Sequence, residues 1–286
     1  MGDYDQALAD AHRAVEIAPD FADSYCTRAT AWLAKREYAK SFEDIERTLA
    51  LDPRNALAIV NRGVIRSHRG DVAQGSADFD EAIRMDPKCV NAYFNRAVAL
   101  INASRFVEAI EDCELAERLD PKQAYIRVIR GFAMQFQGEY EKALDDFNKA
   151  LEMAPECIHA HAAIAMLRAT CPVEEYRDGQ LALASASRAC ELTKWKHSDA
   201  LLALAAANAE IGAFEEAAKW QRKAIELLKE AGDPADRELD VLKLYESGLP
   251  LRNLPRQIDH KLTVLTHDRP IAVLQRIGYA SRRVGT

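Results

Sequence analysis

The sequence predicts an all-α fold, an α-solenoid in which one helix–turn–helix unit repeats along the chain. Three observations point to this fold: a fixed period of 34 residues, small residues at set places in each period, and large apolar residues at helical spacing around them. Prolines mark the period: Pro19, Pro53, Pro87, Pro121 and Pro155.

Complete units begin at residues 22, 56, 90 and 124, and small residues occupy the same places in each. The eighth place holds Ala29, Gly63, Ala97 and Gly131; the twentieth holds Ser41, Gly75, Ala109 and Ala143; the twenty-seventh holds Thr48, Ala82, Ala116 and Ala150. Small side chains facing large ones allow two helix backbones to approach closely. Each unit is therefore predicted to be a tightly packed pair of helices.

The elements follow in order from these patterns. Residues 1–21 are expected to form only the second helix of a unit, without its first helix. In the last regular unit, Gly138 marks the turn between the two helices. The proline near the end of each unit disfavours helical geometry in the residue before it, so it should end the second helix.

The register changes after Cys157. A first helix is expected over 158–169, but the string "TCPVEEYRDG" delays the second helix by five residues, to Ala182, Ala186 and Ala189. The register recovers at Ser198, and a last amphipathic helix is expected over 235–246. We therefore predict a regular array over 1–157, divergent units with an insertion and a capping helix over 158–250, and a basic C-terminal tail over 251–286.

Charge and composition exclude several functions. The 286 residues carry a net charge of −7, yet seven Lys/Arg face two Asp from Arg252 onward. An acidic body argues against nucleic acid as the main partner. The apolar run 200–207 is far shorter than the roughly 20 residues of a membrane helix. Six cysteines without a C-x-x-C pair predict reduced thiols. We expect a cytoplasmic protein.

Taken together, these motifs resemble the tetratricopeptide repeat (TPR) family. To the period, the small residues and the terminal proline they add an aromatic residue at the turn: Tyr4, Tyr38, Phe106, Tyr140 and Phe214. The resemblance implies a right-handed superhelix with a concave peptide-binding groove. The region after Cys157 resembles a variant C-terminal TPR segment of bacterial multidomain proteins, some of which carry a protein kinase upstream.

The resemblance also implies which residues line the groove, namely those at the second, fifth, ninth and twelfth places of each first helix and two neighbouring asparagines. The predicted groove residues are Cys26, Thr30, Val60, Asn61, Val64, Phe94, Asn95, Val98, Tyr125, Val128 and Phe132. This lining is mostly apolar, which favours a bound peptide or helix. Alternatively, tight packing between repeats buries some of these side chains.

Some family members grip the C-terminal carboxylate of chaperones through lysine, arginine and asparagine. Asn61 and Asn95 fit the middle of such a clamp, but its cations would fall on residues such as Tyr125 and Ile129. Chaperone tails are therefore disfavoured, and the two asparagines are expected to hydrogen-bond an extended backbone.

Two ladders of charged residues follow the same period. Arginine recurs as Arg28, Arg62, Arg96 and Arg130, and aspartate as Asp10, Asp44, Asp78, Asp112 and Asp146. A row of arginines could bind phosphate or nucleic acid. Both ladders end after Cys157, however, so we interpret them as structural Arg–Asp bridges between helices.

No enzyme, metal site or cofactor is predicted. His159 and His161 point to different sides of a helix, so with Cys157 and Cys171 they do not provide four tetrahedral ligands. Phosphate-loop, dinucleotide, zinc-protease and serine-hydrolase motifs are missing from the sequence.

The leading prediction is a non-catalytic TPR scaffold that binds a protein or peptide partner in the groove. One alternative is a regulatory or sensor segment of a larger enzyme such as a bacterial protein kinase, and another is a self-associating assembly module. The tail is either disordered or docks as a short helix in the groove or on the N-terminal face.

Overall fold

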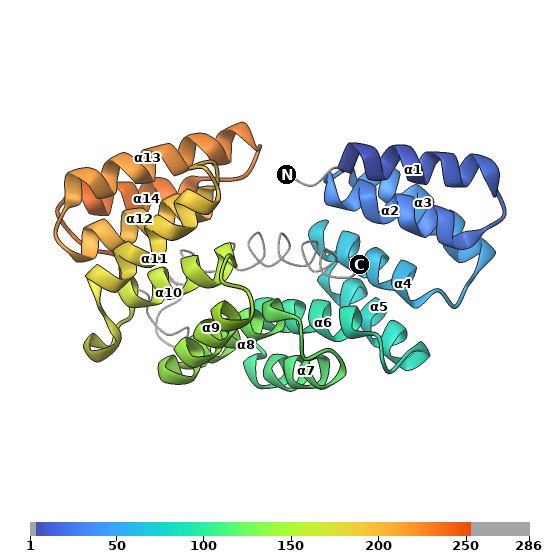
Figure 1. Cartoon of the computed structure of the whole chain (residues 1–286), viewed down its shortest axis with the longest axis horizontal. Helices are drawn as coiled ribbons and strands as arrows, with labels where there is room; N and C mark the ends of the chain where they lie inside the picture. The colour runs from blue at the N-terminus through green and yellow to red at the C-terminus, as the bar shows by residue number, and fades with distance from the viewer. Residues whose placement is uncertain (1–3, 253–286) are drawn as a thin grey trace. The chain divides into compact units, whose positions relative to one another are not determined.

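The computed structural model describes residues 4–252, and within this range every regular element is a helix (Figure 1). The predicted all-α fold is confirmed. The α-helices are α1 (Tyr4–Ile17), α2 (Ala22–Ala34), α3 (Tyr38–Leu51), α4 (Ala56–His68), α5 (Val72–Met85), α6 (Val90–Asn102), α7 (Phe106–Leu119), α8 (Ala124–Gln137), α9 (Tyr140–Met153), α10 (Ile158–Thr170), α11 (Gly179–Leu192), α12 (Ser198–Glu210), α13 (Phe214–Glu230) and α14 (Asp236–Glu246).

The helices pack as the repeat predicts. Within a repeat, the first helix packs on the second, as in α2 with α3, α4 with α5, and α8 with α9. First helices of successive repeats also pack on each other: α2 on α4, α4 on α6, α8 on α10, and α10 on α12. This stacking of helix pairs makes the chain an α-solenoid. The handedness of its superhelix stays a prediction.

The described residues form two compact units. Unit 1 contains residues 4–103 and 111–120, and unit 2 contains residues 104–110 and 121–252. The predicted division of the array at Cys157 rests on sequence regularity rather than compactness and stays a prediction.

The turns between first and second helices share one left-handed residue at the fifteenth place of the repeat. Gly70 and Gly138 have φ of 92° and 87°, which glycine adopts without strain. At the corresponding places, Arg36 and Ser104 adopt φ of 62° and 60°. The backbone conformation therefore repeats even where glycine does not.

Small residues bring the two helices of a repeat together, as predicted. A Cβ atom on Gly131 would lie 2.5 Å from Cε1 of Phe147, and one on Gly63 would lie 2.7 Å from Cε1 of Phe79. The Oγ of Ser41 donates a hydrogen bond of 2.8 Å to the carbonyl oxygen of Ala29. Each glycine leaves the space that a phenylalanine of the second helix fills.

The part after Cys157 contains the predicted helices with the predicted delay. Between α10 and α11 the chain forms a short 3₁₀ helix, Glu174–Tyr176, and the carboxylate of Asp178 accepts hydrogen bonds from the first backbone N–H groups of α11. Alanines dominate the core of α10 to α13. Those of α12 are buried from Ala200 to Ala209. The expected last helix over 235–246 is α14.

Candidate functional site

Each unit has a candidate site, the surface made by the second, fifth, ninth and twelfth residues of its first helices, which we call the first-helix face of that unit. Unit 1 presents it from α2, α4 and α6, and unit 2 from α8, α10 and α12. Because first helices pack side by side within each unit, these places form a row.

In unit 1, two predicted groove residues belong to the core. Cys26 packs in a cluster with Leu33 and Ile45, and Val60 packs in a cluster with Phe79. Both side chains lie beneath the first-helix face because neighbouring first helices pack closely. The prediction that they line an open groove is corrected.

Asn61 is also buried, and its amide has a structural partner. Its Nδ2 donates a hydrogen bond of 3.0 Å to Oγ1 of Thr30, which in turn donates to the carbonyl oxygen of Cys26. This bond joins α2 to α4. The expectation that Asn61 binds a ligand backbone is corrected, since the side chain holds two repeats together. Thr30 is half-buried.

On α6, Phe94 and Val98 are 3% and 8% exposed, so neither offers the open apolar surface that was predicted. Asn95 is half-buried and donates a hydrogen bond of 2.8 Å to the carbonyl oxygen of Asn91. Val64 on α4 is half-buried as well and packs at the edge of two core clusters. Thr30, Val64 and Asn95 are therefore the predicted residues of unit 1 that solvent reaches.

In unit 2, Tyr125 and Phe132 are half-buried, whereas Val128 is fully buried and its predicted exposure is corrected. The Phe132 ring meets the ring of Phe147 edge-on, with centroids 5.3 Å apart. Burial raises the pKa of Tyr125 to about 12, so its hydroxyl is neutral at physiological pH.

A row of aromatic rings crosses the first-helix face of unit 2. Tyr125 meets His159 at 5.6 Å between ring centroids, and His159 meets His197 at 5.9 Å, both edge-on. The Nδ1 of His197 lies 3.8 Å from a carboxylate oxygen of Asp199. Neither His197 nor Asp199 belongs to a motif recognised in the sequence. Asp199 is the second residue of α12, as Tyr125 is the second residue of α8. Extending the groove register to α12 would therefore have predicted Asp199 as a face residue.

The charged ladders are structural, as predicted. Arginine Nε or Nη atoms contact aspartate oxygens at 2.6–3.1 Å in four pairs: Arg28–Asp44, Arg62–Asp78, Arg96–Asp112 and Arg130–Asp146. Each pair joins the two helices of one repeat. The hydrogen bond to Asp44 raises the pKa of Arg28. The arginines are therefore neutralised within the repeat and do not form a phosphate-binding row.

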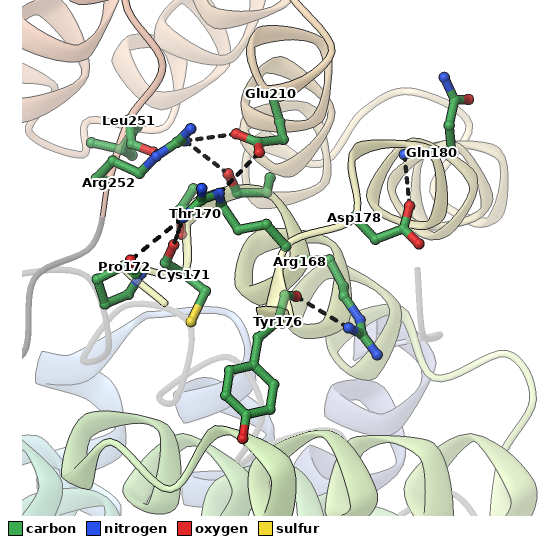
Figure 2. A network of polar contacts seen from close by, with 12 residues as sticks. Arg168, Thr170, Cys171, Pro172, Tyr176, Asp178, Gln180, Glu210, Leu251 and Arg252 are labelled. Atoms are coloured by element: carbon green, nitrogen blue, oxygen red, sulfur yellow. Dashed lines mark hydrogen bonds and ion pairs between the residues drawn. The ribbon is translucent and has the colours of Figure 1, made fainter. Parts of the chain in front are cut away.

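A polar network holds the insertion after α10 (Figure 2). Arg177 donates to the carbonyl oxygen of Cys171 at 3.0 Å and to Glu210 at 3.1 Å. Arg252 pairs with the same carboxylate at 2.6 Å and donates to the carbonyl oxygen of Ala169 at 3.3 Å. Glu210 thus ties both the insertion and the end of the described chain to the end of α12.

The remaining candidate residues have structural surroundings. The ring Nε2 of His161 lies 3.0 Å from the carbonyl oxygen of Pro155. Among residues 4–252, no group of three His, Cys, Asp or Glu side chains could hold a metal ion. All six cysteines lie in this range as thiols rather than disulfides. No helix in the same range has the length and apolar character to cross a membrane.

Comparison with known families decides the identity of the repeat. Tetratricopeptide repeat family models match residues 61–124 and 124–157. Residues 61–157 of the chain are tetratricopeptide repeats. No curated protein matches this TPR chain. The likeness of the region after Cys157 to a variant bacterial TPR segment stays a prediction.

Solved structures share the fold of this TPR protein. A chain of the APC/C hetero-tetramer Cut9–Hcn1 aligns with a TM-score of 0.72 and 12% identity, over 85% of this chain and 46% of that one. PilW, a widely conserved type IV pilus biogenesis factor, aligns with 0.62 and 17%, over 78% and 98%. Yeast Tom70 aligns with 0.59 and 19%, over 84% and 49%. The TPR chain therefore spans about half the length of the first and third of these relatives.

Proposed function

We propose that this TPR protein is a non-catalytic scaffold that binds a peptide segment or a partner helix on the first-helix face of one of its units. The observation that carries the proposal is the row of half-buried side chains left on that face, while the charged ladders and most buried polar groups have partners inside the repeats. A TPR fold suggests a protein-interaction scaffold, and the similar Cut9–Hcn1 structure is an assembly of different chains. Nucleic acid and chaperone tails are not the expected partners, and a cytoplasmic location is expected.

Recognition would depend mainly on apolar contact. Val64 on α4, Phe132 on α8 and Met166 on α10 are half-buried, so each can lose its remaining exposure to a partner. Burial of apolar area contributes about 25 cal/mol per Å² before the costs of association. A few such side chains, with polar neighbours such as Asn95, can serve as the anchors of an interface.

The test uses the full chain as bait in a lysate of its own organism, followed by affinity measurement with the captured partner. Met166→Glu should weaken binding to unit 2 at least tenfold, and Val64→Glu should do the same for binding to unit 1, because each places a charge in an apolar interface. Matched controls are Leu181→Glu and Val107→Glu, which change apolar side chains that are already 53% and 57% exposed elsewhere. Equal affinity of face and control variants would contradict the proposal. Phe94→Glu is unsuitable, because it would place a charge in the core.

Self-association is a second candidate that one observation favours. Ile17 at the end of α1 is 76% exposed, and the neighbouring Phe21 is 56% exposed. Sedimentation velocity tests this candidate directly. Mass that rises with concentration in the wild type, and does not rise in Phe21→Glu, would support it. A role as a regulatory segment of a larger enzyme stays a prediction.

A further inference from the structure

We propose that the C-terminal segment, residues 253–286, binds the first-helix face of unit 2 of its own chain and competes there with the partner. The inference rests on the proposed function, since it names what holds the face when the partner is absent. It is carried by three observations: the point where the described chain ends, the charge of the segment, and the apolar pattern within it.

The described chain ends at the C-terminal ends of α10 and α12, two of the helices that present the first-helix face of unit 2. After α14, Leu251 packs in a cluster with Phe214 and Leu242. Arg252 then reaches back to α10, donating to the carbonyl oxygen of Ala169, and its ion pair with Glu210 holds it there (Figure 2). The Glu210 side chain is 13% exposed, so solvent screens this ion pair only partly. Ala169 is the twelfth residue of α10, so Arg252 is held at the end of a helix that contributes to the face.

The segment and the rest of the chain have complementary charge. The 34 residues after Arg252 carry six Lys/Arg and two Asp, whereas residues 1–252 carry 43 Asp/Glu and 32 Lys/Arg. The twelve places that define the face in α8, α10 and α12 hold no lysine or arginine, and they include Asp199. A basic segment therefore meets no fixed positive side chain at these places.

The segment also carries an apolar stripe that suits the face. Ile271, Leu274 and Ile277 recur every three residues, the spacing of one side of a helix. On the face, Phe132 and Met166 are half-buried apolar side chains. An amphipathic helix that lays its apolar side on such a surface is a common mode of peptide recognition.

Because the segment is covalently attached to the chain, weak contacts are enough for it to occupy the face. A segment of 34 residues can extend about 110 Å, so its length does not limit access to the face. A short flexible tether gives an effective concentration of about 1 mM. With an intrinsic Kd of about 100 μM, the segment would occupy the face about nine-tenths of the time and weaken partner binding about tenfold.

The experiment uses full chains and a fluorescent synthetic peptide of residues 253–286. The test variant Leu274→Glu with Ile277→Glu breaks the apolar stripe, and the control Ala272→Glu with Gln275→Glu changes the charge equally on another side. The test variant should bind the added peptide about tenfold more tightly than the wild type or the control, because its own segment leaves the face. Adding Met166→Glu should abolish this binding, and adding Leu181→Glu should not.

Amide hydrogen exchange of α10 gives a second readout, with exchange faster in the test variant than in the control. Equal peptide affinity in test and control chains, or binding that Met166→Glu leaves intact, would overturn the inference. Doubling of mass in the wild type that is lost in the test variant would also overturn it, since the segment would then bind a second copy. If partner affinity responds to Met166→Glu but is the same in test and control chains, only this inference fails. If the peptide binds to the test variant but no partner is captured, the docking of the segment is supported and only the proposed function fails.

Discussion

In the helix pair α8–α9, Arg130 and Asp146 join the two helices through hydrogen bonds of 2.7 Å. In the pair α12–α13, the same two places hold Leu204 and Trp220. The first pair uses a bidentate charged bridge beside a close contact between Gly131 and Phe147. The second uses buried alanines of both helices, such as Ala205 on α12 and Ala217 on α13.

The difference shows two ways to fix a helix pair. A bridge of arginine and aspartate specifies one register, because the planar guanidinium accepts few arrangements of its partner. Removal of either member destabilises the pair, because the remaining member is left with an unpaired charge. Alanine packing requires only small size and low entropy cost, and it fails when a larger side chain enters.

The largest expected effect comes from removing an aspartate that serves two arginines. The carboxylate of Asp78 accepts four hydrogen bonds, from Arg62 and Arg66, and its side chain is 3% exposed. Asp78→Leu should lower the free energy of unfolding by about 3 kcal/mol, as measured by urea titration. The control Asp80→Leu, two residues along the same helix and 62% exposed, should change it by about 0.5 kcal/mol or less. Equal losses would show that the buried bridge at Asp78 stabilises the fold no more than the exposed ion pair at Asp80 does.

The next effect tests the alanine-packed region. Ala186 on α11 is fully buried in the alanine cluster, so Ala186→Leu should cost about 2 kcal/mol by overpacking. Ala184→Leu on the same helix places the same side chain in solvent and should be nearly neutral, as leucine and alanine are both good helix formers. Thermal melting of both variants checks this. A stable Ala186→Leu chain would mean that the region is loosely packed and unlike the regular repeats.

Much of this fold could be predicted from the sequence because it is local and repeated. The 34-residue period, Gly138 at the turn and the joint loss of both ladders after Cys157 each express a contact within one repeat. The matching of Arg96 with Asp112 rather than Asp78 required the structure. The turns at Arg36 and Ser104 gave no signal, because the stacked helices impose a left-handed conformation that these residues do not favour.

The candidate site was less predictable, since exposure depends on how deeply successive repeats pack. Val60 and Val64 lie one helical turn apart on the same side of α4, yet only Val64 reaches solvent. Asn61 appeared suited to a ligand, but it donates to Thr30 of the previous repeat. A place in the register gives the direction of a side chain and leaves its depth undetermined.

A double-mutant cycle sharpens the account of the ladder with a smaller effect. Arg96→Leu combined with Asp112→Leu should be less damaging than the sum of the single changes by about 1 kcal/mol, because both members of the bridge are removed. Arg96→Leu combined with Asp78→Leu should be additive, since Asp78 bonds to Arg62 and Arg66. Additivity in the first cycle would remove the bridge as a stabilising feature.

The last expected effect separates the two regions by pH. Cys190 is fully buried in the alanine cluster, and burial raises the pKa of its thiol to about 12. The unfolded thiol ionises near its ordinary pKa of about 8.5, so the stabilising difference is complete below that pH and is lost as the pH rises toward 12. The ladder should not change in this window, because hydrogen bonds to aspartate raise the pKa of Arg28 and Arg96.

Urea midpoints of the wild type and Cys190→Ala measure this difference from pH 8 to pH 11. Alanine suits the cluster and does not ionise. The urea midpoint of the wild type should therefore fall relative to that of the variant only above about pH 9. Tyrosines that titrate in the same range are present in both chains and cancel. A constant offset between the two curves would show that Cys190 ionises as freely in the folded chain as in the unfolded one. The alanine-packed region would then admit water, and its contrast with the bridged repeats would reduce to side-chain size.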